Sequence, residues 1–175
     1  MREDKSRQGH IDDDIAGLIT LMNSKGFETT SSCSGRIVLL AIPAFGDKKN
    51  SKWLFKTHGK ASPEDLLMVI EKEGGRLYFL QEPPIIHANC KGLAEAGRLL
   101  EAAKSCGFKH SGITSLKRFS VEIRGSERLE TPLEGASEGF VRMLVDEANK
   151  KLEKGKENLR KLVRLLASFC EPELK

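Results

Sequence analysis

Residues 29–36 contain a high density of side chains that can bind a polar ligand. They read Thr29, Thr30, Ser31, Ser32, Cys33, Ser34, Gly35 and Arg36. Serine and threonine compete for the backbone of a helix, and a strand interior would bury their hydroxyls at a cost. We therefore expect the run at the rim of a strand or in the turn before one. Gly35 allows a tight bend or the close approach of a ligand, and Arg36 offers a planar guanidinium to a carboxylate or phosphate. The run predicts a ligand site, and its alternative interpretation is a plain hairpin turn of serine and glycine.

Three further clusters hold side chains that can accept protons. A polar, glycine-punctuated stretch with Asp4 and Asp12 precedes an apolar helical pattern, and its alternative is a frayed terminus. His58 follows a strand-like stretch, and His87 lies three residues before Cys90. Two strand residues at that spacing face opposite sides, and the four cysteines form no Cys-x-x-Cys pair. We therefore predict no metal site.

The standard motifs of phosphate and cofactor binding do not occur in this sequence. It contains no P-loop, no Gly-x-Ser-x-Gly nucleophile elbow, no His-Glu-x-x-His helix and no strand followed by Gly-x-Gly-x-x-Gly. The residues by themselves thus indicate a polar ligand site in basic surroundings and exclude a Rossmann-type cofactor fold.

Composition indicates an ordinary globular protein. Of 175 residues, 39% are hydrophobic and 31% charged, which suits one domain with its own core, so we predict a single domain over residues 1–175. No apolar stretch approaches the roughly 18 residues that cross a bilayer, and the first ten residues lack the apolar centre of a secretory signal. We expect a soluble, cytoplasmic protein. The net charge of +4 is a mild basic bias that is compatible with nucleic-acid binding.

Apolar periodicity predicts four helices. They cover residues 11–24, 62–73, 92–106 and 138–170. Gly26 and Gly107 follow the first and third helices as stop signals. Along the last helix, apolar residues from Ala148 to Phe169 alternate steps of four and three, which predicts a narrow packing seam. The opposite face is rich in lysine and arginine, and it is either a solvated face or a stripe that follows phosphates.

Apolar and alternating segments predict five strands. They are Ile37–Ile42, Trp53–Thr57, Arg76–Leu80, Ile85–Asn89 and Phe119–Arg124. A helix, a Gly-Phe pair and a strand also recur at an offset of 81 residues, from 27 to 108 and from 38 to 119. We predict an α+β fold with a mixed, largely antiparallel sheet and a long C-terminal helix. The recurrence predicts two duplicated α-β-β units that share one sheet, with a groove between them.

The same clusters, in the same order, resemble a known family. The matching segments are residues 4–12, the run 29–37, Trp53-Leu54-Phe55 with His58, Glu82-Pro83 with His87 and Cys90, residues 107–113, Val121–Arg124 and Leu129–Leu133. This set resembles the wybutosine-synthesis N4-methyltransferases, the third-step enzymes of the tRNA wybutosine pathway, and their archaeal counterparts. The match covers about residues 4 to 133, and the run 29–36 is its most specific part.

The resemblance implies an activity and its partners. Members transfer a methyl group from S-adenosylmethionine to N4 of a tricyclic, demethylwyosine-type guanosine beside the anticodon of tRNA(Phe). The implied fold is α+β and differs from the usual methyltransferase fold, in agreement with the missing glycine-rich cofactor loop.

Physical chemistry suggests roles for the matching residues. Methyl transfer is an in-line displacement whose acceleration comes mostly from alignment, together with removal of a proton from the nitrogen. We expect Arg36 to bind an anion, either the methionyl carboxylate or a phosphate. Hydrogen bonds to cofactor or substrate are expected from the rest of the run, namely Thr30, Ser31, Ser32, Ser34 and Gly35. Asp4 or Asp12 is expected either to accept the proton or to lie near the sulfonium. His58 and His87 are further candidates for proton acceptance or for contacts to base edges.

Two other function classes remain open at this level. An RNA-binding module without chemistry would show a basic groove and no binding of S-adenosylmethionine. A cysteine hydrolase would use Cys33 as nucleophile with His58 or His87 as base, and it would be inactivated by alkylation of Cys33.

Overall fold

Two compact units make up the chain. In this computed structural model the described residues are 11–43, 50–73 and 75–169. Unit 1 comprises Met1–Ser34, Pro84–Ser126 and Gly155–Lys175, and unit 2 comprises Gly35–Pro83 and Glu127–Lys154. The single domain over residues 1–175 stays a prediction.

Unit 1 is an antiparallel sheet with helices on one face. Its elements are α1 (Asp13–Ser24), β1 (Glu28–Cys33), β5 (Ile85–Asn89), α3 (Leu93–Ser105), β6 (Gly112–Ser115), β7 (Ser120–Arg124) and the second half of α4 (Glu138–Ala167). The strand order is β1-β5-β7-β6. Ile86 and Ala88 alternate with half-buried neighbours along β5, and both are fully buried against the helices. The sheet therefore has one apolar face under the helices and one polar face.

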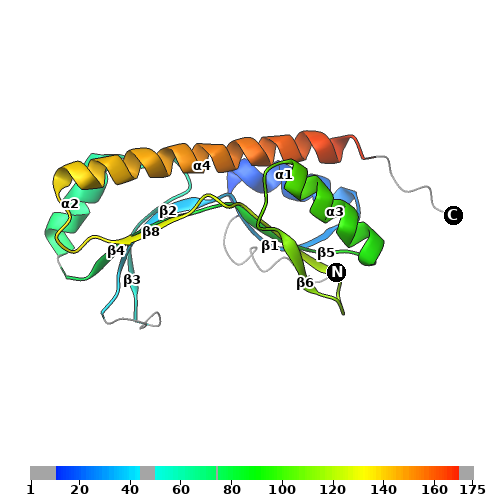
Figure 1. Cartoon of the computed structure of the whole chain (residues 1–175), viewed down its shortest axis with the longest axis horizontal. Helices are drawn as coiled ribbons and strands as arrows, with labels where there is room; N and C mark the ends of the chain where they lie inside the picture. Colours follow the sequence, from blue (N-terminus) through cyan, green and yellow to red (C-terminus); the bar gives the residue numbers. More distant parts are fainter. Residues whose placement is uncertain (1–10, 44–49, 74, 170–175) are drawn as a thin grey trace. The chain divides into compact units, whose positions relative to one another are not determined.

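Unit 2 repeats this arrangement with a second sheet. Its elements are β2 (Arg36–Ala41), β3 (Lys52–Thr57), α2 (Pro63–Glu73), β4 (Leu77–Glu82), β8 (Leu129–Pro132) and the first half of α4. The strand order is β3-β2-β4-β8, and all pairs are antiparallel. Ile37, Leu39 and Phe79 are buried against α2 and α4. Figure 1 shows both helices on the same side of this sheet.

Helix α4 carries the predicted apolar seam. Ala148 and Leu152 are buried in the core of unit 2, and Leu159 and Leu162 are buried in the core of unit 1. On its basic face, Lys151 forms an ion pair with Glu127 and Lys156 forms one with Asp14. These pairs agree with a structural role for that face. Helix α4 ends at Ala167. The predicted end of this helix, residue 170, lies outside the described residues.

The structure confirms the α+β class, the antiparallel pairing and the long C-terminal helix, and it corrects several details. The strands form two four-stranded sheets rather than one. Three strands were not predicted, namely β1, β6 and β8. All three are short or rich in polar side chains, so they lack the apolar alternation on which strand prediction depends. No helix within the described parts of the chain is long and apolar enough to cross a membrane.

The predicted duplication is visible at two helix ends. After α1, Phe27 N–H donates to Met22 and Gly26 N–H to Asn23; after α3, Phe108 and Gly107 donate in the same pattern. Both glycines have positive φ, 89° and 101°, as the Schellman motif requires. The repeat stops there. The strand containing residue 38 belongs to the sheet of unit 2, whereas the strand after residue 119 belongs to unit 1.

Candidate active site

The polar run forms an edge strand and the turn after it. Residues 28–33 are β1, which pairs only with β5 among the described strands. Gly35 follows with a φ of 94°, a left-handed conformation that favours glycine, and Arg36 begins β2. The expectation of a strand rim or turn therefore holds. An edge strand leaves alternate backbone N–H and C=O groups unpaired, which makes them available to a ligand.

Helix α1 fixes both ends of β1. At the start, the Asn23 amide donates to Thr29 Oγ1 at 2.8 Å, and Thr29 N–H donates to Asn23 Oδ1 at 3.1 Å. At the end, the backbone N–H and the hydroxyl of buried Ser34 both donate to Asp12 Oδ2, at 2.7 and 2.9 Å. Asp12 occupies the N-cap position of α1, but its side chain makes no capping bond there. Its carboxylate instead holds the end of β1.

A β-bulge decides which hydroxyl of β1 meets which neighbour. The register shifts between Thr29 and Ser31, so that Ser31 lies opposite His87 and Ser32 lies opposite Ile86. Ser31 therefore points to the polar face of the sheet, while Ser32 points toward the helices. The Ser32 hydroxyl oxygen is buried and has no hydrogen-bond partner among the described residues.

Three strands of unit 1 contribute one hydrogen-bonded row, which we call the Ser31–His87–Glu122 row. Ser31 Oγ lies 2.9 Å from His87 Nδ1, and His87 Nε2 lies 2.9 Å from Glu122 Oε2. A carboxylate only accepts, so Nε2 carries the ring hydrogen and donates it to Glu122. In the neutral ring, Nδ1 is then the basic nitrogen, and the Ser31 hydroxyl donates to it. The row can pass a proton from Ser31 to His87 while Glu122 stabilises the resulting imidazolium.

The row lies on the polar face and is accessible to a substrate. The side chains of His87 and Glu122 are 34% and 24% exposed. A parallel row beside it is also hydrogen-bonded, with Ser120 donating to Asn89 at 2.6 Å and Asn89 donating to Glu28 at 3.2 Å. These bonds order the face around His87, because each polar side chain is held by its neighbour across the strands.

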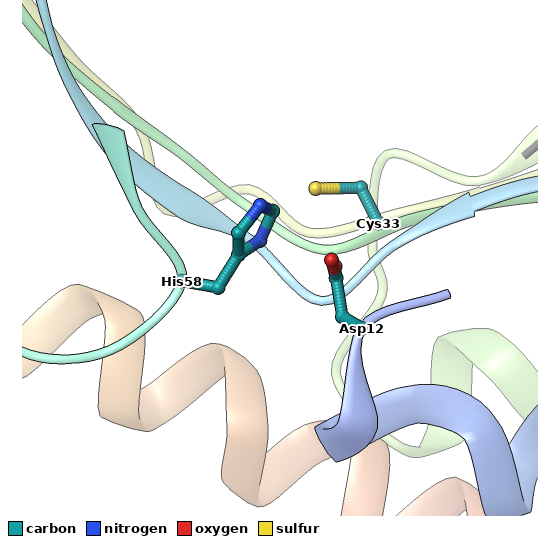
Figure 2. Close-up of side chains that lie close together, drawn as sticks. All are labelled: Asp12, Cys33 and His58. Carbon is teal, nitrogen blue, oxygen red and sulfur yellow. The ribbon is translucent and has the colours of Figure 1, made fainter. Parts of the chain in front are cut away.

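Cys33 lies near Asp12 at the end of β1. A carboxylate oxygen of Asp12 is within 4.8 Å of the Cys33 sulfur (Figure 2). Within unit 1, the two ring nitrogens of His87 lie 2.9 Å from Ser31 Oγ and 2.9 Å from Glu122 Oε2. Cys90 is buried, and this burial, reinforced by the negative charge of Glu95, raises the pKa of its thiol to about 11.

His58 and Arg36 belong to unit 2. The Nδ1–H of His58 donates to the carbonyl oxygen of Gly35 at 3.0 Å, which leaves Nε2 as the basic nitrogen of the neutral ring. The Arg36 guanidinium uses Nε to bond Glu82 at 2.5 Å and lies 4.9 Å from the centroid of the Trp53 ring. These contacts fix the plane of the guanidinium, whose remaining N–H groups are the candidate donors to an anion.

Comparison with known proteins identifies the family. The model of the methyltransferase TYW3 family matches residues 1–168. The chain belongs to the TYW3 methyltransferase family. The prediction that it is a methyltransferase enzyme of wybutosine-type tRNA modification is thereby confirmed.

Relatives and solved structures agree with this assignment. A protein of Thermococcus sibiricus, named tRNA(Phe) 7-((3-amino-3-carboxypropyl)-4-demethylwyosine(37)-N(4))-methyltransferase, is 43% identical over 91% of this chain and 85% of its own length. The tRNA wybutosine-synthesizing protein 3 homolog of Danio rerio is 36% identical over 97% of this chain and 72% of its own. The solved structure of PH1069 from Pyrococcus horikoshii has a TM-score of 0.85 at 40% identity and covers 91% of this chain and 87% of its own.

The structure brings some of the predicted site residues into contact and leaves others apart. Ser31 and His87 are brought together, and Asp12 is joined to Ser34. Thr30 donates to the His87 carbonyl oxygen at 3.4 Å, and Asp4 lies outside the described residues. Sequence reasoning did not select Glu122 as a site residue. The signal that could have identified Glu122 is the alternation of Ser120, Glu122 and Arg124 with apolar residues along β7, which places Glu122 on the polar face of the sheet.

Proposed function

We propose that this protein transfers a methyl group from S-adenosylmethionine to N4 of a demethylwyosine-type guanosine beside the anticodon of tRNA(Phe). The observation that carries the proposal is family membership over residues 1–168, together with relatives named for this reaction. The polar face of unit 1 supports it, because that face supplies a proton-accepting row at an accessible position.

The edge strand β1 fits the amino-acid end of S-adenosylmethionine. Among the described strands β1 is an edge strand whose backbone groups suit the methionyl amino and carboxylate groups, and the buried Ser32 hydroxyl has no partner among the described residues. We assign Thr30, Ser32 and the backbone of β1 to this end of the cofactor. When bound, S-adenosylmethionine supplies an electrophilic methyl carbon on a positively charged sulfur.

The Ser31–His87–Glu122 row removes the proton that the nitrogen must lose. With S-adenosylmethionine bound, Ser31 Oγ would accept the N4 proton while the Ser31 hydroxyl proton passes to His87 Nδ1. The positive charge then on the imidazole is stabilised by Glu122 across 2.9 Å. A positioned acid–base group of this kind contributes about 10²- to 10⁴-fold to a rate.

The other predicted residues receive positioning or binding roles. Asp12 positions the end of β1, because its Oδ2 already accepts two hydrogen bonds from Ser34. Arg36 is assigned to an RNA phosphate through the guanidinium N–H groups that do not face Glu82. His58 stays a candidate for proton acceptance or for a contact to a base edge.

Methyl transfer in vitro tests the proposal. The purified chain is incubated with S-adenosylmethionine carrying a labelled methyl group and with tRNA(Phe) from cells that lack this methyltransferase step, and the nucleosides are analysed by mass spectrometry. We expect one labelled methyl on the tricyclic nucleoside, and none on tRNA(Phe) that is already methylated at N4. RNA binding without binding of S-adenosylmethionine would instead support a non-catalytic module.

A further inference from the structure

The sheet of unit 2 has a face that α2 and α4 do not cover. Residues that alternate with the core positions Ile37 and Leu39 point to this side, which we call the outer face of unit 2. Its exposed or half-buried members are Arg36, Leu40, Trp53, Lys56, Arg76, Tyr78, Glu82, Arg128, Glu130 and Pro132. Val38 and Leu80 lie on the same side but are buried, at 1% and 9% exposure. The active-site row of unit 1 uses none of these residues.

One register row of this face is apolar and aromatic across all four strands. Trp53 of β3 lies opposite Leu40 of β2, Leu40 lies opposite Tyr78 of β4, and Tyr78 lies opposite Pro132 of β8. Trp53 is 49% exposed, and both Leu40 and Tyr78 are half-buried. Trp53 and Tyr78 are the single tryptophan and the single tyrosine of the chain. The rings of Trp53 and Tyr78 thus lie in one row, on strands about 10 Å apart with one strand between them.

Arginines hold the two aromatic rings. The Arg36 guanidinium lies 4.9 Å from the centroid of the Trp53 ring and is fixed on its other side by Glu82. The Arg76 guanidinium lies 6.0 Å from the centroid of the Tyr78 ring. Each ring is therefore oriented before a ligand arrives, which lowers the entropy lost when a flat group stacks on it.

The charge of the outer face favours a polyanion. Among its described residues there are four cations and two carboxylates, and Glu82 and Glu130 are both paired with arginines of the same face. Lys56 and Arg76 are exposed and flank the aromatic row. Aromatic platforms bordered by basic side chains bind single-stranded RNA, whose bases stack on the rings while the cations contact phosphates.

We propose that the outer face of unit 2 binds unstacked bases of single-stranded RNA, with one base on Trp53 and another on Tyr78. This proposal rests on the proposed function, in which the RNA is the anticodon loop of tRNA(Phe). It assigns substrate binding to residues other than those of the proton-accepting row. A second copy of the chain would also cover an apolar row, but the positive excess on this face would repel an identical positive face.

Trp53 reports on its own site, because no other tryptophan contributes fluorescence. The first probe is the unmodified anticodon stem-loop of tRNA(Phe), titrated into the protein without S-adenosylmethionine. We expect quenching of the Trp53 emission as a base stacks on the indole. A blunt RNA duplex of equal phosphate number is the control probe, and it should leave the emission nearly unchanged.

Substitutions then separate stacking from folding. Tyr78→Ala retains the fluorescent reporter and should raise the Kd for the stem-loop by about 5- to 150-fold, the loss of one stacked base. Trp53→Ala, followed by anisotropy of a labelled stem-loop, should show a loss in the same range, and Trp53→Phe should restore most of it. Phe140→Ala is the matched control, because Phe140 is 38% exposed on α4 of the same unit. It should bind as the unsubstituted protein does.

The two proposals fail in different ways. Quenching with loss in Tyr78→Ala, but without methyl transfer, retains the RNA platform and rejects the proposed reaction. Methyl transfer with an unchanged KM for tRNA in Trp53→Ala and Tyr78→Ala rejects the platform and retains the reaction. A Trp53 emission that depends on protein concentration, with a dimer in sedimentation and no response to the stem-loop, would also overturn the platform in favour of a self-association surface.

Discussion

Replacement of Glu122 by glutamine tests the proton-accepting row most directly. The substitution keeps the size of the side chain and removes its negative charge. Glu122 Oε2 lies 2.9 Å from His87 Nε2, so the charges of a carboxylate and an imidazolium would be about 4 Å apart. At that separation their attraction is about 1 kcal/mol in water and about 4 kcal/mol at the effective dielectric constant of a protein surface.

Partial exposure places the expected effect between those limits. The two side chains are 34% and 24% exposed, so solvent screens a good part of the attraction. We take about 2 kcal/mol for the loss of imidazolium stabilisation, which corresponds to a roughly 30-fold fall in the rate of methyl transfer. The neutral amide oxygen can still accept from Nε2–H, so the orientation of the ring, and hence the affinity for RNA, should change little.

Single-turnover methyl transfer measures this effect free of product release. We expect Glu122→Gln to lower the single-turnover rate about 30-fold while the affinities for S-adenosylmethionine and tRNA change by less than about twofold. Glu122→Asp retains the charge and should recover part of the rate. Glu101→Gln is the control, because Glu101 is an exposed carboxylate on α3, on the helical side of the same unit. An unchanged rate in Glu122→Gln, or an equal fall in Glu101→Gln, would refute the assignment.

Three further predictions concern stability and reactivity. In Gly155→Ala the new Cβ would lie 2.6 Å from Cδ of the Pro84 ring, so the free energy of unfolding in urea should fall by about 1–2 kcal/mol. In Gly97→Ala the new Cβ would meet no atom within 4 Å, so the higher helix propensity of alanine should raise the free energy of unfolding by about 0.5–1 kcal/mol. Gln81 is fully buried, and its amide has no partner among the described residues. Gln81→Met should therefore raise the free energy of unfolding by about 1–3 kcal/mol, which a rise of the Tm by a few degrees would report. A lower Tm would show that the amide has a partner. Because the pKa of Cys90 is raised from 9.0 to about 11, its thiolate at pH 8 is about 100-fold scarcer. Peptide mass spectrometry should find Cys90 alkylated slowly in the native protein and rapidly in urea.

The helices could be predicted because their signals are local. The third helix ends at Ser105, close to its predicted limit, since Gly107 supplies a left-handed residue that a side chain would strain. The same Gly-Phe pair follows α1 and α3, so the repeated C-terminal cap could also be predicted from the sequence. The division of the strands between two sheets depends on pairings between distant segments, such as β4 with β8, and no local pattern records them.

The composition of the site was predictable, but its geometry was not. Alternation alone places His87 and Glu122 on the polar faces of their own strands. Their contact requires that β5 and β7 be neighbours in one particular register, which the sequence does not state. For this reason Glu122 was overlooked, although the segment around it was part of the family resemblance.

The bulge in β1 shows most clearly why side-chain roles in the polar run could not be assigned from sequence. Thr29 lies opposite Ala88, and in a regular ladder Thr30 would then lie opposite His87 and Ser31 opposite Ile86. The one-residue shift instead puts Ser31 against His87 and turns Ser32 toward the core. A one-residue slip exchanges the two faces of a strand, so adjacent hydroxyls that are chemically alike receive opposite roles. In the proposed mechanism Ser31 carries the proton, whereas Ser32 has a buried hydroxyl without a partner among the described residues, and the backbone bulge decides between these two positions.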